Sequence, residues 1–384
     1  MLILPSYDFF STYSGTGYLL DRLEEQGVDF YVLMRTEKRN VAEYASSKHK
    51  MKFFSWWKPQ WPFLLRRCSN LAFSIYAFCH LLFAKKVLVL DSMYLSEVAL
   101  VRRFRKNLQV IQFCQELQIV SDYPNNRFAK IYSRHARQAD LVLDVDPFRA
   151  EKRKEICNLE KLPLVLRNTI PLSAVVPSAE KSLLELARVE SFAGLPVVLY
   201  AGGIGAEKPF SRLVYAIAAM NTPVYFLAFC ATTPSLFEEA QQYAAEKLKP
   251  GTFIIRPRVA RDDILAVQSQ ADVGIVDYPY SLEQTWNQKF CAPTKLYEYM
   301  AAGLAVVGSD NDSLRAVVED NHAGSCARSA RVESLAIALD EVTSSRDTLV
   351  AMKANAAKAF RDQYAYELCC YPVIDQLVAF INEA

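Results

Sequence analysis

The chain has 384 residues, enough for two domains of ordinary size. Its 52% hydrophobic and 22% charged residues exclude a disordered or fibrous protein. The net charge of +2 is unevenly placed: residues 1–170 hold 26 Lys and Arg against 17 Asp and Glu, whereas residues 171–384 hold 18 against 25. A basic half of this kind indicates an anionic partner, either nucleic acid or a membrane surface.

The N-terminal half alternates apolar runs with segments of helical period. The apolar N-terminus has no basic leader region, so we expect a first buried strand there and no cleavable signal. The nine cysteines are scattered without a CxxC pair, which indicates reduced thiols, a cytoplasmic location and no zinc site. The predicted strands cover 1–4, 28–34, 86–90, 108–113, 140–143 and 163–166, and the predicted helices 16–26, 94–106, 126–138 and 148–158.

Residues 53–86 break this alternation. Three of the four tryptophans fall between positions 56 and 61, beside basic residues, and an apolar run over 71–84 follows. That run is too short for a membrane-spanning helix, which needs about 20 residues. Two interpretations stay open: a core helix that covers the first sheet, or an interfacial element that contacts anionic lipid. Because no nucleic-acid-binding motif is visible, we expect peripheral membrane contact and no nucleic acid.

The C-terminal half has a clearer pattern of continuous apolar strands that alternate with helices, which is typical of a parallel, doubly wound sheet. The fold class is therefore α/β, with two doubly wound Rossmann-like domains facing across a cleft. The predicted strands cover 197–200, 224–229, 252–256, 273–276 and 305–308, and the predicted helices 208–220, 234–248, 261–270 and 294–302. The predicted domains are 1–170 and 196–365, joined by a linker over 171–195 and followed by a helix over 366–384 that packs back on the first domain.

The segment "CAPTKLYEYMAAGLAVVGSD" (291–310) has the features of a ligand site at a helix start. Pro293 suits the first helical position, and the N–H groups of a first turn bind anions. Lys295 is unfavourable there by the helix dipole alone, which indicates a bound anion such as a diphosphate. Glu298 lies about one turn further on and could accept hydrogen bonds from ribose hydroxyls. Gly303 is expected as the left-handed residue after the helix.

The segment "LYAGGIGAEKPF" (199–210) complements it. Gly202 and Gly203 follow a strand and allow the backbone to approach a ligand closely, and Lys208 adds a positive charge. The segment matches neither the dinucleotide-binding nor the P-loop pattern. The segment indicates a ligand site only in combination with Lys295 and Glu298.

These segments carry a resemblance to a known family. "YAGGIGAEKPFSRLVYAI" and "APTKLYEYMAAGLAVVGSD" are similar to two segments of the nucleotide-sugar-binding domain of GT-B glycosyltransferases, especially the retaining glycosyltransferase family 4. "YSGTGYLLDRLEEQGVDFYVL", "RQADLVLDVDPFRAEKR" and "LRNTIP" resemble segments of the acceptor domain more faintly. The resemblance covers nearly the whole chain and is strongest over 196–320.

The resemblance implies a role for each matching residue. Lys208 and Lys295 would neutralise the donor diphosphate and act in catalysis, and Glu298 would hold the ribose. The remaining donor-site residues that it implies are Gly15, Gly17, Gly202, Gly203, Arg256, Val259, Pro293 and Thr294. Among these, Thr294 would offer its backbone N–H to a phosphate, and the turn over 256–260 would meet the base.

Three positions depart from the family's pattern. Gly203 stands where an arginine is usual, Phe290 replaces the first acid of a Glu pair, and Gln115 replaces a histidine. Glu116 is then the best acidic candidate for catalysis on the acceptor side. The DxD string at Asp144 and Asp146 would bind a metal in GT-A enzymes, but the two-domain pattern does not fit that class, so no metal is expected.

The predicted function is a metal-independent, retaining glycosyltransferase of polysaccharide biosynthesis at the inner face of the cell membrane. It would transfer a sugar from a nucleoside diphosphate sugar, UDP- or GDP-linked, to a hydroxyl of a lipid-linked or cell-surface glycan. No cofactor is expected. Two alternatives stay open: a GT-B-fold nucleotide-sugar epimerase, and a non-catalytic GT-B-like subunit that acts as a binding partner.

Overall fold

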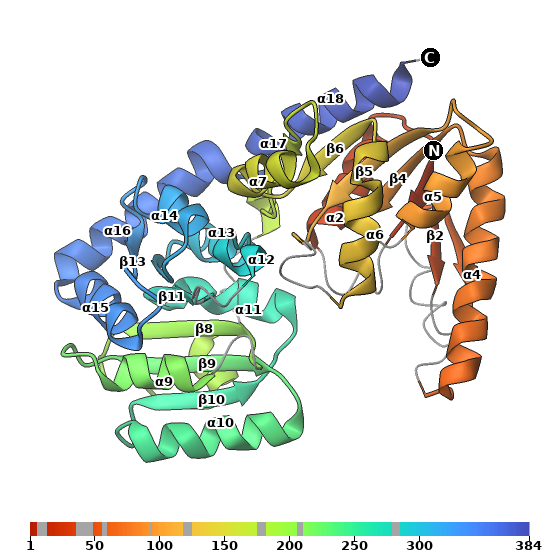
Figure 1. Cartoon of the computed structure of the whole chain (residues 1–384). Coiled ribbons are helices and arrows are strands. Elements are labelled where there is room, and N and C mark those ends of the chain that lie inside the picture. The colour runs from red at the N-terminus through yellow and green to blue at the C-terminus, as the bar shows by residue number, and fades with distance from the viewer. Residues whose placement is uncertain are drawn as a thin grey trace. The chain divides into compact units, whose positions relative to one another are not determined.

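The computed structural model describes residues 1–5, 14–35, 49–55, 60–92, 94–117, 125–174, 182–205, 210–278 and 285–383. The chain divides into two compact units, Met1–Arg167 with Cys370–Ala384, and Asn168–Cys369. The segment 171–195, expected as a linker, falls within the second unit. Each unit contains one parallel sheet flanked by helices (Figure 1).

The first unit is built on a seven-stranded sheet in the order β3-β2-β1-β4-β5-β6-β7, and every neighbouring pair is parallel. The reversal of strand order beside β1 is that of a doubly wound sheet. The strands are β1 (Leu2–Leu4), β2 (Tyr31–Arg35), β3 (Met51–Phe54), β4 (Lys86–Leu90), β5 (Gln109–Cys114), β6 (Leu141–Asp144) and β7 (Leu164–Val165). The helices are α2 (Ser14–Glu25), α4 (Phe63–Phe83), α5 (Leu95–Arg102), α6 (Arg127–His135), η2 (Ala136–Gln138), α7 (Pro147–Cys157) and α18 (Tyr371–Asn382).

Helix α4 has one buried and one exposed face. Phe73, Ala77 and Leu81 pack into the core formed by alternate residues of β1, β2, β4 and β5. The helix therefore covers the sheet, as one of the two interpretations of this segment requires. It is longer than the apolar run predicted it to be, since it begins at Phe63. Even so, no helix in the described ranges is long and apolar enough to cross a bilayer.

The last helix, α18, belongs to the first unit and packs on α2. The guanidinium of Arg22 on α2 lies 4.1 Å from the centre of the Tyr371 ring and 3.7 Å from a carboxylate oxygen of Asp375. The ammonium of Lys86, at the start of β4, donates to the carbonyl of Phe380 at 3.2 Å. The end of the chain is thus held by cation contacts to an aromatic ring, a carboxylate and a carbonyl.

The second unit is built on a six-stranded parallel sheet in the order β10-β9-β8-β11-β12-β13. Its strands are β8 (Val197–Gly203), β9 (Tyr225–Ala231), β10 (Phe253–Pro257), β11 (Val273–Val276), β12 (Ala305–Gly308) and β13 (Gly324–Cys326). Its helices are η3 (Leu172–Ala174), α8 (Leu183–Ala187), α9 (Phe210–Ala218), α10 (Pro234–Lys247), α11 (Arg261–Val267), η4 (Gln268–Gln270), α12 (Trp286–Lys289), α13 (Thr294–Ala301), α14 (Asp312–Val318), α15 (Val332–Thr343), α16 (Arg346–Ala359), η5 (Phe360–Tyr364, a π-helix) and α17 (Tyr366–Cys369).

The core of the second unit follows from the continuous apolar strands. Alternate residues such as Val198 and Tyr200 of β8 face α9, α10 and α15, while Leu199 between them is buried on the other side. Both faces are therefore covered, as expected for a parallel sheet. The prediction of two doubly wound sheets is confirmed.

Some boundaries differ from those predicted. Strands β3 and β13 were not predicted, since both are short and neither is a continuous run of β-branched residues. Pro293 is the N-cap residue of α13 and not its first helical residue as expected, while the helix begins at Thr294, where the predicted range 294–302 begins. Gly303 follows α13 with φ +73°, as predicted.

Candidate functional site

A pocket of about 220 Å³ lies where β8, β9 and β10 end. It is lined by Ala201, Gly202, Gly203, Phe229, Ala231, Arg258, Val259, Arg261, Ile264 and Glu298. Ligands of doubly wound sheets bind outside the carboxyl ends of the strands, and this pocket has that position. A larger hollow of about 610 Å³ in the first unit lies between the starts of β6 and β7, at the opposite strand end.

Helix α13 is locked to the sheet by one tyrosine. The Tyr299 ring packs against β11 at Gly274, where a Cβ would collide with the ring. Its hydroxyl accepts a hydrogen bond from the backbone N–H of Ala201 at 2.9 Å. The helix then ends in a Schellman motif, because the N–H of Gly303 donates to the carbonyl of Met300 and that of Leu304 to the carbonyl of Tyr299. The first turn of α13 is thereby fixed beside the end of β8.

Lys295, in that first turn, lies against aromatic rings. Its ammonium is 4.4 Å from the centre of the Tyr200 ring and 5.7 Å from that of Tyr278. A Cβ on Gly202 would collide with Nζ of Lys295, so this glycine makes room for the amine. The structure therefore brings Lys295 and Gly202 together, as the sequence predicted.

A buried ion pair between Arg212 and Asp277 lies near Lys295, close enough for Asp277 and Lys295 to interact electrostatically. Asp277, which follows β11, accepts from Nε of Arg212 on α9 at 3.2 and 3.0 Å. Burial raises the pKa of Asp277, and the positive charges of Arg212 and Lys295 oppose that rise. Nη2 of Arg212 is buried and has no hydrogen-bond partner among the residues that the structure describes. Neither residue was predicted, since a single Arg and a single Asp 65 positions apart give no local signal.

Glu298 lines the pocket and is paired with Arg261. Nε and Nη2 of Arg261 donate to Oε1 of Glu298 at 2.9 and 2.6 Å. The Glu298 side chain is 15% exposed and that of Arg261 is 32% exposed. Arg258 and Arg261 were not predicted as site residues. Arg258 lies in the turn over 256–260, which was expected to meet the base and could have indicated it, and Arg261 begins α11 directly after that turn.

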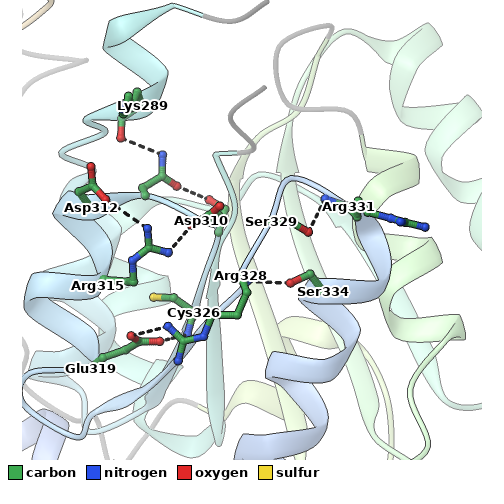
Figure 2. A network of polar contacts seen from close by, with 12 residues as sticks. Lys289, Asp310, Asp312, Arg315, Glu319, Cys326, Arg328, Ser329, Arg331 and Ser334 are labelled. Atoms are coloured by element: carbon green, nitrogen blue, oxygen red, sulfur yellow. Dashed lines mark hydrogen bonds and ion pairs between the residues drawn. The ribbon is translucent and has the colours of Figure 1, made fainter. Parts of the chain in front are cut away.

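The segment that leads into α13 is held by side chains from other elements. Nδ2 of Asn311 donates to the carbonyls of Gln288 and Lys289 at 2.7 and 3.1 Å, which satisfies the end of α12. Figure 2 shows this contact to Lys289 and, next to it, Arg315 between Asp310 and Asp312. Nδ2 of Asn168 donates to the carbonyl of Ala292 at 3.0 Å. These contacts hold both sides of the 290–293 turn.

Of the other predicted donor-site residues, some line the pocket and others do not. Val259 and Gly203 line the pocket, whereas Arg256 does not, because its guanidinium donates to the carbonyls of Ala187 and Arg188. Thr294 is the first helical residue of α13, and its N-cap residue Pro293 makes no side-chain cap hydrogen bond. Lys208 lies outside the described residues.

The loop after β5 in the first unit is clamped by buried charged groups. Oδ1 of Asp91 accepts from the backbone N–H groups of Gln115 and Glu116 at 2.8 and 3.0 Å. Nη1 of Arg149 donates to the carbonyl of Gln115 at 2.6 Å, and Nη2 of Arg153 to that of Glu116 at 3.1 Å. All four backbone groups of this dipeptide are therefore bound. The clamp positions Glu116, the predicted acidic candidate, and was not visible in the sequence.

Asp91 is partly buried and has φ +54°, a left-handed conformation that Asp tolerates better than most residues. Burial raises its pKa to about 6, and the nearby charge of Glu116 adds to the rise. The two backbone N–H groups and the positive charge of Arg153 oppose it. The carboxylate is thus kept ionised near neutral pH only by the groups that it holds.

The DxD string has structural roles in the first unit. Asp144 is fully buried and forms an ion pair with Nε of Arg153. Oδ1 of Asp146 caps α7 by accepting from the N–H groups of Phe148 and Arg149. Within the described residues, no group of three or more His, Cys, Asp or Glu could hold a metal ion.

Two predicted glycines of the first unit lie in a helix. Gly15 and Gly17 are in the first turn of α2, which begins at Ser14, two residues before the predicted helix start at 16. A Cβ on Gly17 would have no neighbour within 4 Å among the described residues, so packing against these residues does not require a glycine there. Near them, Oγ1 of Thr16 accepts from Nε2 of the buried Gln115 at 2.8 Å.

Comparison with known proteins identifies the class. Residues 185–359 match the family described as glycosyl transferases group 1, a stretch that contains the whole pocket and α13. The predicted resemblance is confirmed, and so is the predicted class of enzyme, a glycosyltransferase. The finer assignment to retaining family 4 stays a prediction. No curated protein matches the sequence.

Solved structures share the fold over the full length. A glycosyltransferase from Rickettsia africae ESF-5 is 14% identical, with a TM-score of 0.75 over 100% of this chain and 99% of that chain. HepE (Alr3699) from Anabaena in complex with UDP and glucose is 14% identical, with a TM-score of 0.74 over 99% of each chain. Sucrose-phosphate synthase from Thermosynechococcus elongatus is 16% identical, with a TM-score of 0.70 over 99% and 97%. These likenesses show the fold, the predicted GT-B type with two doubly wound units.

The raised pKa of Asp91 predicts a pH-dependent effect of Asp91→Asn. Asn keeps an oxygen that can accept both N–H groups but never ionises. The pKa of Asp91 is about 6 in the folded protein and has an ordinary value of 3.8. Its ionisation therefore lowers the free energy of unfolding of the wild type as pH rises between these two values. At pH 7 we expect the variant to exceed the wild type by up to about 3 kcal/mol in unfolding free energy, and the two to converge near pH 4. Urea unfolding at both pH values measures this, and an equal difference at both contradicts it.

Proposed function

We propose that the protein transfers a sugar from a nucleoside diphosphate sugar to a hydroxyl of a lipid-linked or cell-surface glycan. The observation that carries this proposal is that Glu298 and Gly202 line one pocket inside the group 1 match and that the amine of Lys295 lies against Gly202. A cation at a helix start suits a diphosphate, and a carboxylate one turn away suits vicinal hydroxyls. We place the donor in this pocket.

The proposed chemistry follows from the charge that develops as the glycosidic bond breaks. The leaving diphosphate becomes more negative, and Lys295, the first turn of α13 and Lys208 would stabilise it. Glu116 would act on the acceptor side. These cations would make a metal unnecessary, and we propose that the anomeric configuration is retained, in keeping with the family 4 resemblance. The complex of HepE with UDP and glucose supports UDP as the first nucleotide to test.

We further propose that the protein contacts anionic lipid at the inner face of the membrane through α4. The side of this helix opposite its buried face presents Leu64, Leu71 and Ile75, which are 72%, 64% and 57% exposed, together with Cys68 and Cys79. We call these five residues the outer stripe of α4. A helix that is apolar on both faces is normally buried on both.

Charge favours lipid as the surface that covers the outer stripe. From Met51 to Leu90 the sequence contains no Asp or Glu, while six Lys and Arg lie in that segment. Arg67 lies over the Phe63 ring at 4.5 Å, next to the first turn of α4. Apolar side chains flanked by cations are the pattern that binds anionic membrane interfaces. Trp56 and Trp57, expected at the headgroups, lie outside the described residues.

The donor site predicts selective stabilisation by one nucleotide. We expect one of UDP, GDP, ADP and CMP, at about 100 times its dissociation constant, to stabilise the protein by about 2.7 kcal/mol in a thermal-shift measurement. Lys295→Ala should weaken that nucleotide about 10- to 100-fold, because a charge-assisted contact is lost. Lys247→Ala, on α10, is the control with an equal change of charge.

The outcomes separate the alternatives. Stabilisation that Lys295→Ala reduces and Lys247→Ala leaves unchanged supports the donor site and identifies the base. Absence of a shift with all four nucleotides contradicts the donor site and favours a non-catalytic subunit. Binding accompanied by interconversion of two nucleotide sugars, with no glycoside formed on any acceptor, favours the epimerase.

Gly202 gives a second test of the position of Lys295. The Cβ in Gly202→Ala would displace Nζ, the flexible end of the lysine, so we expect an unchanged melting temperature but nucleotide affinity reduced about tenfold. Gly203→Ala is the matched control, because its Cβ would only approach the carbonyl of Ala231 at 3.7 Å. Isothermal titration of the nucleotide measures both, and equal affinities of the two variants would show that Lys295 does not contact it.

Membrane contact predicts that the protein floats with anionic vesicles. We expect wild type to bind phosphatidylcholine vesicles that contain phosphatidylglycerol, and to bind less as salt rises, since surface charge is screened. Leu71→Glu with Ile75→Glu should reduce flotation at least tenfold. Ile337→Glu with Val350→Glu adds the same charge at exposed apolar sites of the second unit and should leave flotation unchanged. Equal loss in both variants, or dimerisation through α4 without vesicles, contradicts the proposal.

A further inference from the structure

Arg261 contacts Glu298 in an unusual way. A guanidinium can pair with both oxygens of a carboxylate at once. Here Nε and Nη2 both donate to the same oxygen, Oε1, at 2.9 and 2.6 Å. Among the residues that the structure describes, none forms a hydrogen bond to Oε2 of Glu298. One oxygen of the carboxylate is thus fixed by Arg261, and the other accepts no hydrogen bond from the described part of the chain.

Both side chains belong to the same pocket but to different elements. Arg261 is the first residue of α11, and Glu298 lies on α13. The α13 backbone near Glu298 is also held, because Nε2 of Gln268 donates to the Glu298 carbonyl at 3.0 Å. The main chain and one carboxylate oxygen are therefore fixed before any ligand arrives.

We infer that Arg261 is a positioning residue that orients Glu298 so that Oε2 accepts a hydrogen bond from a ribose hydroxyl of the donor. The inference rests on the proposed function, since it assigns the ligand of Glu298 within the same pocket. A long, flexible acid loses conformational entropy when it is fixed on a ligand, and a side chain that is already oriented loses less. Arg261 thereby makes the pocket selective for ribose over deoxyribose.

The charge of Arg261 distinguishes this role from phosphate binding. Its guanidinium already faces the Glu298 carboxylate, so that its charge is largely neutralised inside the pocket. Arg258 lines the same pocket, and no ion pair with Glu298 is present there. Of the two arginines, only Arg261 is paired with Glu298. Arg258→Ala removes the same charge from the pocket as Arg261→Ala and is therefore its matched control.

The test measures discrimination between ribose and deoxyribose. Dissociation constants of UDP, 2′-deoxy-UDP and 3′-deoxy-UDP are compared by isothermal titration, or of the corresponding three nucleotides if another base is preferred. We expect wild type to prefer UDP over at least one deoxy form about tenfold or more. Arg261→Ala should reduce that ratio to about 1–3, as should Glu298→Gln. Arg258→Ala should change all three affinities together and leave the ratio unchanged.

A double variant separates positioning from a general structural effect. If Arg261 acts through Glu298, adding Arg261→Ala to Glu298→Gln changes the ratio no further. Wild-type binding with a ratio that Arg261→Ala leaves intact overturns the inference, as does equal binding of all three nucleotides by wild type. Failure of the wild type to bind any nucleotide contradicts the proposed function instead, so the two failures are distinguishable.

Discussion

The contact of Tyr299 with Gly274 and Ala201 is the interaction on which the proposed donor pocket depends. The ring occupies space on β11 that only a glycine leaves open, and the hydroxyl accepts the N–H of Ala201 near the end of β8. One side chain therefore joins α13 to two neighbouring strands. Lys295 and Glu298 precede it on the same helix, so their distance from the β8 end is set by this packing and not by flexible loops.

In both units, side chains form hydrogen bonds with loop backbone groups near the carboxyl ends of the strands. Backbone groups of a functional loop are bound by polar side chains from elsewhere in the sequence, such as Asp91 for the loop after β5 and Asn311 for the end of α12. Burying these groups without partners would cost free energy, so the fold supplies partners. In the first unit the partners are charged, and burial raises the pKa of one of them, Asp91, to about 6. In the second unit they are mostly neutral amides and hydroxyls.

The fold could be predicted because its signals are local. Continuous apolar runs and helical periods mark most strands and helices, and Gly303 marks the end of α13 through its positive φ. The short strands β3 and β13 have no such signal and depend on pairing with a neighbour. The closeness of Lys295 and Glu298 to each other could be predicted because one helix presents both. Arg261, Asp277 and Asp91 could not, since each acts on a partner distant in sequence.

The departure at Gly203 has a consequence for the charge of the donor pocket. The family resemblance implies an arginine there, and its absence removes one cation from the end of β8. The structure places two other arginines at the pocket, Arg261 at the start of α11 and Arg258 in the turn between β10 and α11. Because Glu298 neutralises Arg261, a net cation from that turn remains only at Arg258. Positive charge thus lies beside the end of β10, at Arg258, as well as at Lys295. The family's pattern would instead place an arginine at the end of β8, where Gly203 stands.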